Sequence, residues 1–350
     1  MPPPSLAVVV IARNEEKTVG DCIASCLESV RFAKEQGLIG DAEIVLVDSA
    51  SSDRTREIAG HLSVRILSLP SHWPLSAAAG RFIGLTHTSS DLVFFVDGDY
   101  VLEPSWLVQA LPELKADDIA GVCGVDREKL PGTNSMSRYV LKLTERAIPT
   151  ERRVETEVIA IGVYQRVWID RAGGIQPFLR GAEDRDLAIR VRAIGGRLIK
   201  TKEVMGVHHW TQERDLTFIE YFSSVARWSY GEGQAARNGL RDPYVFHVYR
   251  NRYFNVRSLI GIETGLCIAL WWTGAAILGL ISLSFGLLAL VVGFAIMFRG
   301  TFVGTTRLRE AVFQLHQVPY VLVRLGCFAL GFLHPPRPAD QYPRELPNGQ

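Results

Sequence analysis

The sequence predicts an α/β domain on a mainly parallel sheet, followed by membrane-embedded helices at its C-terminal side. Two observations predict the domain: short β-branched runs alternate with helical patterns over the N-terminal half, and polar clusters end the runs. A third predicts the helices, because residues 264–298 contain no charged side chain. At 350 residues, the chain is long enough for one main domain and an appendage.

Four apolar runs predict buried strands. They are rich in β-branched residues and nearly continuous, as in parallel strands that are covered on both faces. They lie at residues 6–11, 43–47, 64–69 and 92–96. Helical patterns separate or precede them, at residues 15–35, 53–61 and 75–88. In an open α/β sheet of this kind, ligands bind beyond the carboxyl ends of the strands.

Polar residues gather at those carboxyl ends. The first run ends in Ala12–Glu16, the second in Asp48–Asp53 and the fourth in Asp97–Asp99, so three polar clusters are expected to face one crevice. No G-x-G-x-x-G follows the first run and no G-x-x-x-x-G-K-[ST] occurs, which disfavours dinucleotide oxidoreductases and P-loop enzymes. The 38 Lys+Arg and 37 Asp+Glu nearly cancel, at +1, which disfavours nucleic-acid binding.

Asp97 and Asp99 are candidate metal ligands. A strand that stops at two carboxylates flanking a glycine can present both to one hard divalent cation. A second D-x-D triplet occurs at Asp184–Asp186, so the triplet alone does not separate a metal site from ordinary turn aspartates. The position of the first triplet, directly after a fully apolar run, is the stronger signal.

Acidic residues also open a later helix. Glu183, Asp184 and Asp186 precede a pattern that places Leu187, Val191 and Ile194 on one face. Acids in a first helical turn often only complement the helix dipole. Three acids in four positions repel one another, however, and a carboxylate at a sheltered helix start can serve as a general base.

Two adjacent histidines end a further apolar run. In a strand, His208 and His209 point to opposite faces, so only one of them can share a given metal site. His208 is favoured for that site, and His209 is expected to pack or to face solvent.

The C-terminal part predicts a membrane hairpin. As one helix, residues 264–298 would measure about 52 Å, against about 30 Å for a hydrocarbon core, so two tight spans fit better. Arginines lie on both sides of this stretch, and a hairpin keeps both groups on the cytoplasmic side. Residues 318–333 are expected as a short span or a re-entrant element. Their Arg324 is expected to contact a lipid phosphate or to extend to the interface.

The predicted division of the chain follows from these segments. The N-terminus lacks the positive start and cleavage site of a signal peptide, so the first domain is expected in the cytoplasm, on the inner or plasma membrane. The expected parts are a cytosolic α/β domain at 1–245, an interfacial amphipathic segment at 246–263, the hairpin at 264–298, a cytosolic or interfacial segment at 299–317, the third membrane segment at 318–333 and a disordered tail at 334–350.

Four ordered motifs resemble those of the inverting glycosyltransferases of family 2, which have the GT-A fold. They are VVVIARNEE, EIVLVDSASSDRT, VFFVDGDY and GGIQPFLRGAEDRDLAIRVRAIGG, and the match spans about residues 5–215. The apolar C-terminal part is similar to that of bacterial members that build exopolysaccharide or glycolipid. The resemblance implies transfer of a sugar from a nucleoside diphosphate, a UDP-sugar ahead of a GDP-sugar, to a hydroxyl of a lipid-linked acceptor at the membrane.

The resemblance also implies a role for each motif residue. The nucleobase and ribose pocket would be lined by Asn14, Glu15 and Asp48, with Arg81 near the donor phosphates. Asp97 would face the ribose and the metal, Asp99 would ligate Mg²⁺ or Mn²⁺, and His208 would complete the metal shell. Asp184 would be the base of a single displacement, with Glu183 touching the acceptor.

The sequence departs from a family motif at residues 224–228, and two alternative functions remain. Residues 224–228 resemble the Q-x-x-R-W element of processive synthases but lack its glutamine, which favours transfer of a single sugar. Arg227 and Trp228 either line the site or lie at the interface. A sugar-1-phosphate nucleotidyltransferase would be expected to carry a glycine-rich loop, which Ala12–Glu16 lacks. A non-catalytic membrane scaffold would not need the intact acids.

Overall fold

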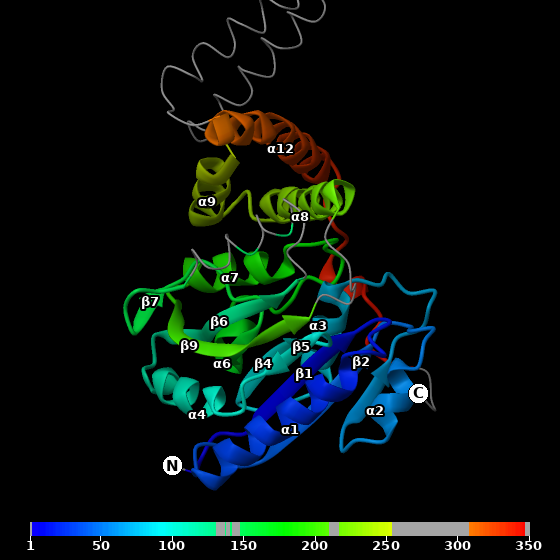
Figure 1. The fold of residues 1–350 in the computed structure, drawn as a ribbon, viewed down its shortest axis with the longest axis vertical. Helices are drawn as coiled ribbons and strands as arrows, with labels where there is room; N and C mark the ends of the chain where they lie inside the picture. The colour runs from blue at the N-terminus through cyan, green and yellow to red at the C-terminus, as the bar shows by residue number, and fades with distance from the viewer. Residues whose placement is uncertain are drawn as a thin grey trace, which may run out of the picture.

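The computed structural model describes residues 2–130, 137, 141, 148–209, 217–253 and 308–346, the last range by backbone alone at 308–319 and 321. A mixed α/β part forms one end of the molecule (Figure 1). Three helices lie over it: α8 (Phe218–Asn238), α9 (Pro243–Tyr253) and α12 (Leu308–Leu333). The hairpin expected at residues 264–298 lies outside the described residues.

The four predicted strands form the parallel half of the sheet. They are β1 (Leu6–Ala12), β2 (Ala42–Asp48), β3 (Arg65–Ser68) and β4 (Leu92–Asp97). β1 lies between β2 and β4, in a register that pairs Ala12 with Asp48 and Ile11 with Asp97. The ends of these strands therefore bring the predicted polar clusters to one edge of the sheet, as the sequence predicts.

The second half of the sheet is mixed. It contains β5 (Tyr100–Leu102), β6 (Ile119–Lys129), β7 (Arg153–Glu155), β8 (Gly162–Gln165) and β9 (Arg197–His209). The strand order is β3-β2-β1-β4-β8-β6-β9-β5, and β7 pairs with β9. β8 runs antiparallel to both β4 and β6. β9 pairs with β5 and β6 at once, which brings His208 opposite Tyr100 and Glu128.

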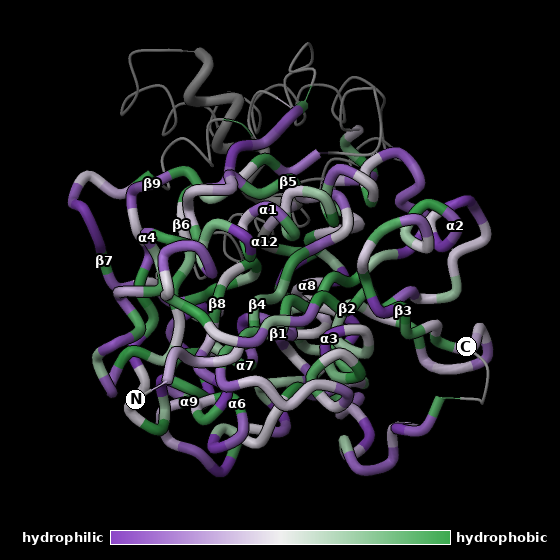
Figure 2. Tube along the Cα trace, turned by 90° about the horizontal axis from the view of Figure 1, so that it is seen from below, coloured by the Kyte–Doolittle hydropathy of each residue, from purple (hydrophilic) through white to green (hydrophobic). Residues whose placement is uncertain are grey.

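Helices cover both faces of the sheet. Figure 2 shows α1 (Val19–Glu35) and α4 (Trp106–Ala110) on one side and α3 (Ala77–Thr86), α6 (Arg166–Arg171) and α7 (Glu183–Ala193) on the other. The short helices α2 (Thr55–Gly60) and η1 (Leu111–Lys115) follow β2 and α4. α3 lies very close to the sheet at Gly84, where a Cβ would collide with the Val9 side chain, so this close approach requires glycine.

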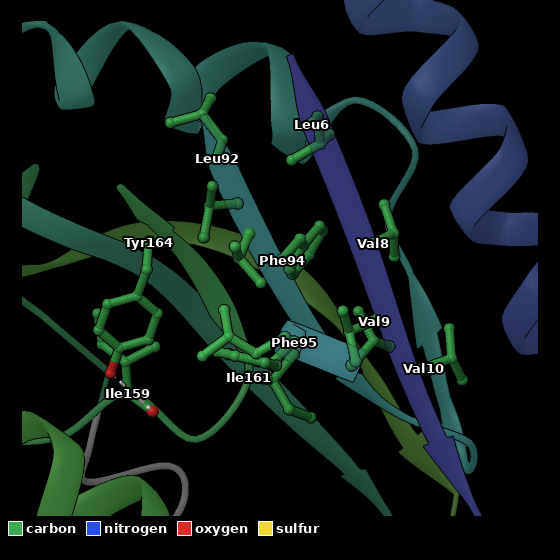
Figure 3. Packing of buried hydrophobic residues seen from close by; sticks show 14 of the residues in the cluster. Leu6, Val8, Val9, Val10, Leu92, Phe94, Phe95, Ile159, Ile161 and Tyr164 are labelled. Atoms are coloured by element: carbon green, nitrogen blue, oxygen red, sulfur yellow. Dashed lines mark hydrogen bonds between the residues drawn. The ribbon is translucent and has the colours of Figure 1, made fainter. Parts of the chain in front are cut away.

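The core lies between these layers. Leu6, Val8, Val9 and Val10 of β1 are fully buried, together with Phe94 of the neighbouring strand (Figure 3). Both faces of β1 are covered, which explains why its sequence is apolar throughout and does not alternate. On α7, Leu187 and Val191 are buried as predicted, whereas Ile194 is 38% exposed because the helix has ended at Ala193.

The C-terminal helices pack on one another. α12 lies along α8, and the ring of Phe328 stacks 3.8 Å from the ring of Tyr253 at the end of α9. Residues 318–333 form the last part of α12, where the Arg324 guanidinium lies 4.5 Å from the centre of the Tyr253 ring. Within the described ranges, we find no helix that has both the length and the hydropathy needed to cross a membrane.

The tail differs from the expected disorder. Residues 334–346 run from α12 back to the α/β part (Figure 1) and include the 3-10 turn η2 (Ala339–Gln341). Tyr342 is 2% exposed, and its ring meets those of Trp73, Phe82 and Phe178 at 5.3–5.8 Å, edge to face. Its hydroxyl donates to the Pro74 carbonyl at 2.9 Å. The prediction of disorder is wrong for this segment, because one buried aromatic anchor outweighs its polar, proline-rich composition.

Candidate active site

A cavity of about 430 Å³ opens at the carboxyl ends of β1 and β4. Its walls come from the strand ends, from the loop before α3, from β9 and from α8. They are formed by Ile11, Ala12, Arg13, Glu15, Ser49, Leu75, Ser76, Ala77, Asp97, Gly98, Asp99, His208 and Arg227. This is the edge of the sheet at which the sequence predicts a ligand site.

Hydrogen bonds between the loops after β1 and β2 hold one wall in place. Asn14 has a left-handed backbone, with φ 59°, a conformation that Asn tolerates better than most residues. Its Oδ1 accepts from the Ser52 N–H at 2.9 Å, and its own N–H donates to the Ser51 hydroxyl at 2.9 Å. Asp48 is fully buried and accepts from the Ser51 N–H at 3.2 Å.

Asp48 lies behind this wall because it is fully buried, whereas Asn14 is exposed. Neither is among the described residues that line the cavity, and the nucleobase and ribose contacts expected of them stay predictions. Glu15, the third of the predicted group, does line the cavity. Burial and the nearby negative charge of Asp99 raise the pKa of Glu15 to about 7, so this carboxyl group titrates near neutrality.

Asp99 and His208 form the acidic end of the cavity. His208 Nε2 lies 3.1 Å from Asp99 Oδ2, and His208 Nδ1 lies 2.9 Å from Glu128 Oε2. Although burial opposes a charge on the imidazole, hydrogen bonds to these two carboxylates raise the pKa of His208 to about 11. His208 lines the cavity, and His209 is not among its described lining residues.

A buried arginine, Arg81, joins Asp97 at the end of β4 to the acid pair at the start of α7, Glu183 and Asp184. Arg81 Nη2 lies 2.8 Å from Asp97 Oδ1, and Arg81 Nη1 bonds to Glu183 Oε1. The side chains of Arg81 and Glu183 are both 7% exposed. Burial raises the pKa of Glu183, and the Arg81 cation acts against that rise. Both terminal nitrogens of Arg81 are engaged by carboxylates, and one of these, Asp97, lines the cavity; the contact with donor phosphates expected of Arg81 stays a prediction.

Asp184 follows directly and is the more accessible acid of the pair. The loop that precedes it turns through a left-handed Ala182, with φ 58°, into the first turn of α7. Asp184 Oδ1 accepts from the Arg185 N–H at 2.8 Å. Its side chain lines a second, narrow cavity with Arg81, Tyr164 and Glu183, and not the larger cavity. The two cavities adjoin through the Arg81–Asp97 ion pair.

Sequence reasoning missed one cation of the cavity wall and left a second one open. Arg13 lies within the first polar cluster but was assigned no role, whereas Arg227 was expected either to line the site or to lie at the interface. The structure places both against the larger cavity, whereas Trp228 is 53% exposed. The signal for Arg13 was its position between Ala12 and Asn14 at a strand end. The signal for Arg227 was the resemblance of residues 224–228 to the Q-x-x-R-W element.

The side chains of the site fit a divalent cation only if a bound substrate supplies further oxygen atoms to it. No group of three His, Cys, Asp or Glu side chains in the described part of the chain is arranged to hold a metal ion. Asp99 and His208 offer two ligand groups side by side, whereas Asp97 is engaged by Arg81. Mg²⁺ typically takes one or two carboxylates and completes its shell with substrate phosphates and water. The site therefore suits a metal that arrives with a diphosphate.

Comparison with known proteins finds sequence similarity to glycosyltransferases. The family model described as "Glycosyl transferase family 2" matches residues 7–171. A pre-mycofactocin glycosyltransferase of Mycobacterium tuberculosis is 27% identical over 213 residues, covering 57% of this chain and 43% of that protein. A 4,4'-diaponeurosporenoate glycosyltransferase of Staphylococcus haemolyticus is 26% identical over 113 residues, covering 31% of this chain and 27% of that protein. The chain thus spans less than half the length of these curated relatives.

A solved structure shares the fold. It is a mannosyltransferase from Pyrobaculum calidifontis in complex with GDP-Man and Mn²⁺, with a TM-score of 0.57 and 17% identity. The match covers 95% of this chain and 88% of that one. The mixed α/β architecture predicted from the sequence is confirmed as GT-A-like.

Proposed function

The chain belongs to glycosyltransferase family 2 through residues 7–171, and we propose that it transfers a sugar from a nucleoside diphosphate to an acceptor hydroxyl by single displacement. One observation carries the proposal: a cavity at the sheet edge holds Asp99 and His208 side by side, and the Arg81 ion pairs connect this cavity to Glu183, the neighbour of Asp184. The same arrangement would thus bind a diphosphate and supply a carboxylate that accepts the proton of the attacking hydroxyl.

The donor would lie in the larger cavity. Asp99 and His208 would hold Mg²⁺ or Mn²⁺, with Asp97 beside them, and such an ion would neutralise the charge that develops on the departing diphosphate. Glu15 would meet the nucleoside. Arg13 and Arg227 line the same cavity and add positive charge near the phosphates. A UDP-sugar or a GDP-sugar fits this chemistry.

Asp184 is assigned as the base. Its partner Glu183 is buried and held by Arg81, so it is poorly placed to accept a proton from an incoming hydroxyl. The Asp184 carboxylate would take the acceptor proton while the acceptor oxygen forms its bond to the anomeric carbon and the bond from that carbon to the diphosphate breaks. The configuration at the anomeric carbon inverts, and no covalent enzyme intermediate forms.

The acceptor is proposed to be a lipid-linked saccharide or another membrane lipid. The support is the sequence of residues 264–298, which has no charged side chain and lies between α9 and α12. Exposed aromatic side chains on α8 and α9, Trp228 and Phe246, suit a headgroup region. On this proposal the α/β domain works at the cytoplasmic face of the inner or plasma membrane.

The testing experiment is a calorimetric titration of detergent-purified protein with a panel of nucleoside diphosphates, with and without Mn²⁺. Metal-dependent binding of one nucleotide by the wild type, lost in Asp99→Ala, is the expected result. Nucleotide-sugar turnover should then release that nucleoside diphosphate. Release of pyrophosphate would instead indicate a nucleotidyltransferase, and absence of any nucleotide binding would favour a non-catalytic scaffold.

A further inference from the structure

Two residues of α8, Gly231 and Gln234, touch the loop that leads into Glu183 and Asp184. A Cβ at Gly231 would collide with the carbonyl oxygen of Gly181, so the two backbones are in direct contact. Gln234 Oε1 accepts from the Arg180 N–H at 3.3 Å, and Gln234 Nε2 donates to the His334 carbonyl at 3.2 Å. Gln234 is 5% exposed, so water does not replace these bonds readily.

Glu232 holds the first turn of α7, on the other side of the acid pair. This carboxylate is buried and forms an ion pair with Arg185 Nε at 2.8 Å, one residue after Asp184. It also accepts from Arg252 Nε at 2.9 Å and from the Tyr253 hydroxyl, both at the end of α9. A buried carboxylate with three donors is well satisfied, and loss of it would leave two guanidinium groups without their partner.

These contacts bracket the acid pair. Residues 180 and 181 before it and Arg185 after it are all held by α8, whereas the carboxylate of Asp184 itself bonds only to the adjacent Arg185 N–H among its described hydrogen bonds. The left-handed Ala182 between these anchors is a conformation that a non-glycine residue keeps only when its surroundings impose it. The position of the Asp184 carboxylate therefore depends on the backbone that α8 supports.

We propose that Gly231, Glu232 and Gln234 are positioning residues for the reaction: they fix the backbone of residues 180–185 so that Asp184 meets the acceptor hydroxyl. This inference rests on the proposed function, in which Asp184 is the base. It goes beyond that function in giving α8, which follows the matched family region, a share in catalytic geometry.

Two glycines of α8 provide a matched pair of variants. Gly231→Ala forces the Gly181 carbonyl away, whereas Gly233→Ala presses on the Phe328 carbonyl of α12, two residues along the same helix. Both changes gain the same helix propensity. We expect Gly231→Ala to speed hydrogen exchange in a peptide spanning residues 178–186 and to lower kcat about 10²-fold at unchanged donor KM, as a misplaced catalytic group does. Gly233→Ala should leave both quantities near those of the wild type.

Gln234 supplies a second test if Gly231→Ala folds poorly. Gln234→Met removes the acceptor for the Arg180 N–H, and Gln234→Glu restores an oxygen there while losing the donor to His334. Faster exchange and lower kcat in the methionine variant, with recovery in the glutamate variant, are the expected results. The proposal is overturned if exchange of 178–186 is unchanged in Gly231→Ala and Gln234→Met, or if Gly231→Ala and Gly233→Ala lower kcat alike.

Failure of the proposed function would look different. In that case Asp184→Asn would turn over a nucleotide sugar as fast as the wild type, whatever α8 does to the loop. If Asp184→Asn loses turnover but the α8 variants neither loosen the loop nor slow the reaction, the base assignment stands and the positioning role of α8 is wrong.

Discussion

Replacing Arg81 by methionine should destabilise the protein strongly and in a pH-dependent manner. The substitution keeps an apolar side chain against the sheet but leaves Glu183 buried without its cation. Removing one partner of a buried ion pair typically costs about 3–5 kcal/mol. Asp97 adds less to that cost, because its side chain is 33% exposed and water screens it.

The pH dependence follows from Glu183. Burial already raises the pKa of this carboxyl group, and loss of Arg81 removes the cation that opposes the rise. An acid whose pKa is higher in the folded than in the unfolded protein destabilises the fold as pH rises above the unfolded value, about 4.3. Protonating it costs at most about 1.36 kcal/mol per pH unit above that value, roughly 5 kcal/mol at pH 8 and 1 kcal/mol at pH 5.

The assay is urea unfolding followed by tryptophan fluorescence at pH 8 and pH 5, in the same detergent. The free energy of unfolding should fall by about 3–5 kcal/mol in Arg81→Met at pH 8 and by about 1–2 kcal/mol at pH 5. Arg31→Met is the control. Arg31 Nη1 also forms an ion pair with a glutamate, Glu35, at 2.7 Å, but both of these side chains are about half exposed. The control should lose at most about 0.5 kcal/mol. An Arg81→Met loss that is equal at both pH values, or no larger than the control, would refute the buried-pair argument.

Three further predictions follow from the tail and the cavity. Tyr342→Ala should lower the free energy of unfolding by about 3–5 kcal/mol, as loss of a buried aromatic side chain does. Tyr342→Phe loses only the hydrogen bond to the Pro74 carbonyl and should cost about 1 kcal/mol. Equal losses in the two variants would show that the ring contacts contribute little. Asp184→Asn should keep nucleoside diphosphate affinity and lose at least about 10²-fold in transfer rate, and calorimetry beside a rate assay separates this outcome from the binding loss expected of Asp99→Ala. With the pKa of His208 raised to about 11, the imidazole is protonated at pH 7.5 before metal binds, so Mn²⁺ binding should release close to one proton. Calorimetry in buffers of different ionisation enthalpy measures that proton, and a binding enthalpy independent of buffer would contradict it.

The strands and the site edge could be predicted because they depend on local pattern. A parallel strand that is covered on both faces must be apolar throughout, and the first polar residue after it must lie at the sheet edge. Asp97 and Asp99 follow such a strand, and the structure brings them to the same cavity as Glu15. His208 and His209 point to opposite faces of a strand, so the sequence could predict that only one of them shares the site, and the resemblance to a family histidine supported His208. The pairing of β9 with β5 supplies the physical reason.

Contacts between distant segments could not be predicted in this way. Asp48 ends a strand like Asp97, but the Ser51 N–H turns it inward, and no pattern in the strand distinguishes the two aspartates. Tyr342 lies in a polar, proline-rich tail whose composition predicts disorder, and its aromatic partners are far away in the sequence. Composition measures the average hydrophobicity of a segment, whereas docking of a tail requires only one side chain that fits a preformed pocket.

Arg81 lies between these two cases. Its sequence context indicates a buried arginine, whereas the family resemblance directed attention to the donor phosphates. The segment AAAGRFIGLT places one arginine in a helix that is otherwise small and apolar, and such a helix packs against a sheet on most of its surface. A guanidinium at that position is buried and therefore requires carboxylate partners. Acids at the adjacent strand end and at the start of α7 were already candidates for that role, and the structure pairs Arg81 with Asp97 and Glu183 among them. That pairing links the donor end of the sheet to the acid pair, and it makes the stability of the fold and the geometry of the site depend on the same side chain.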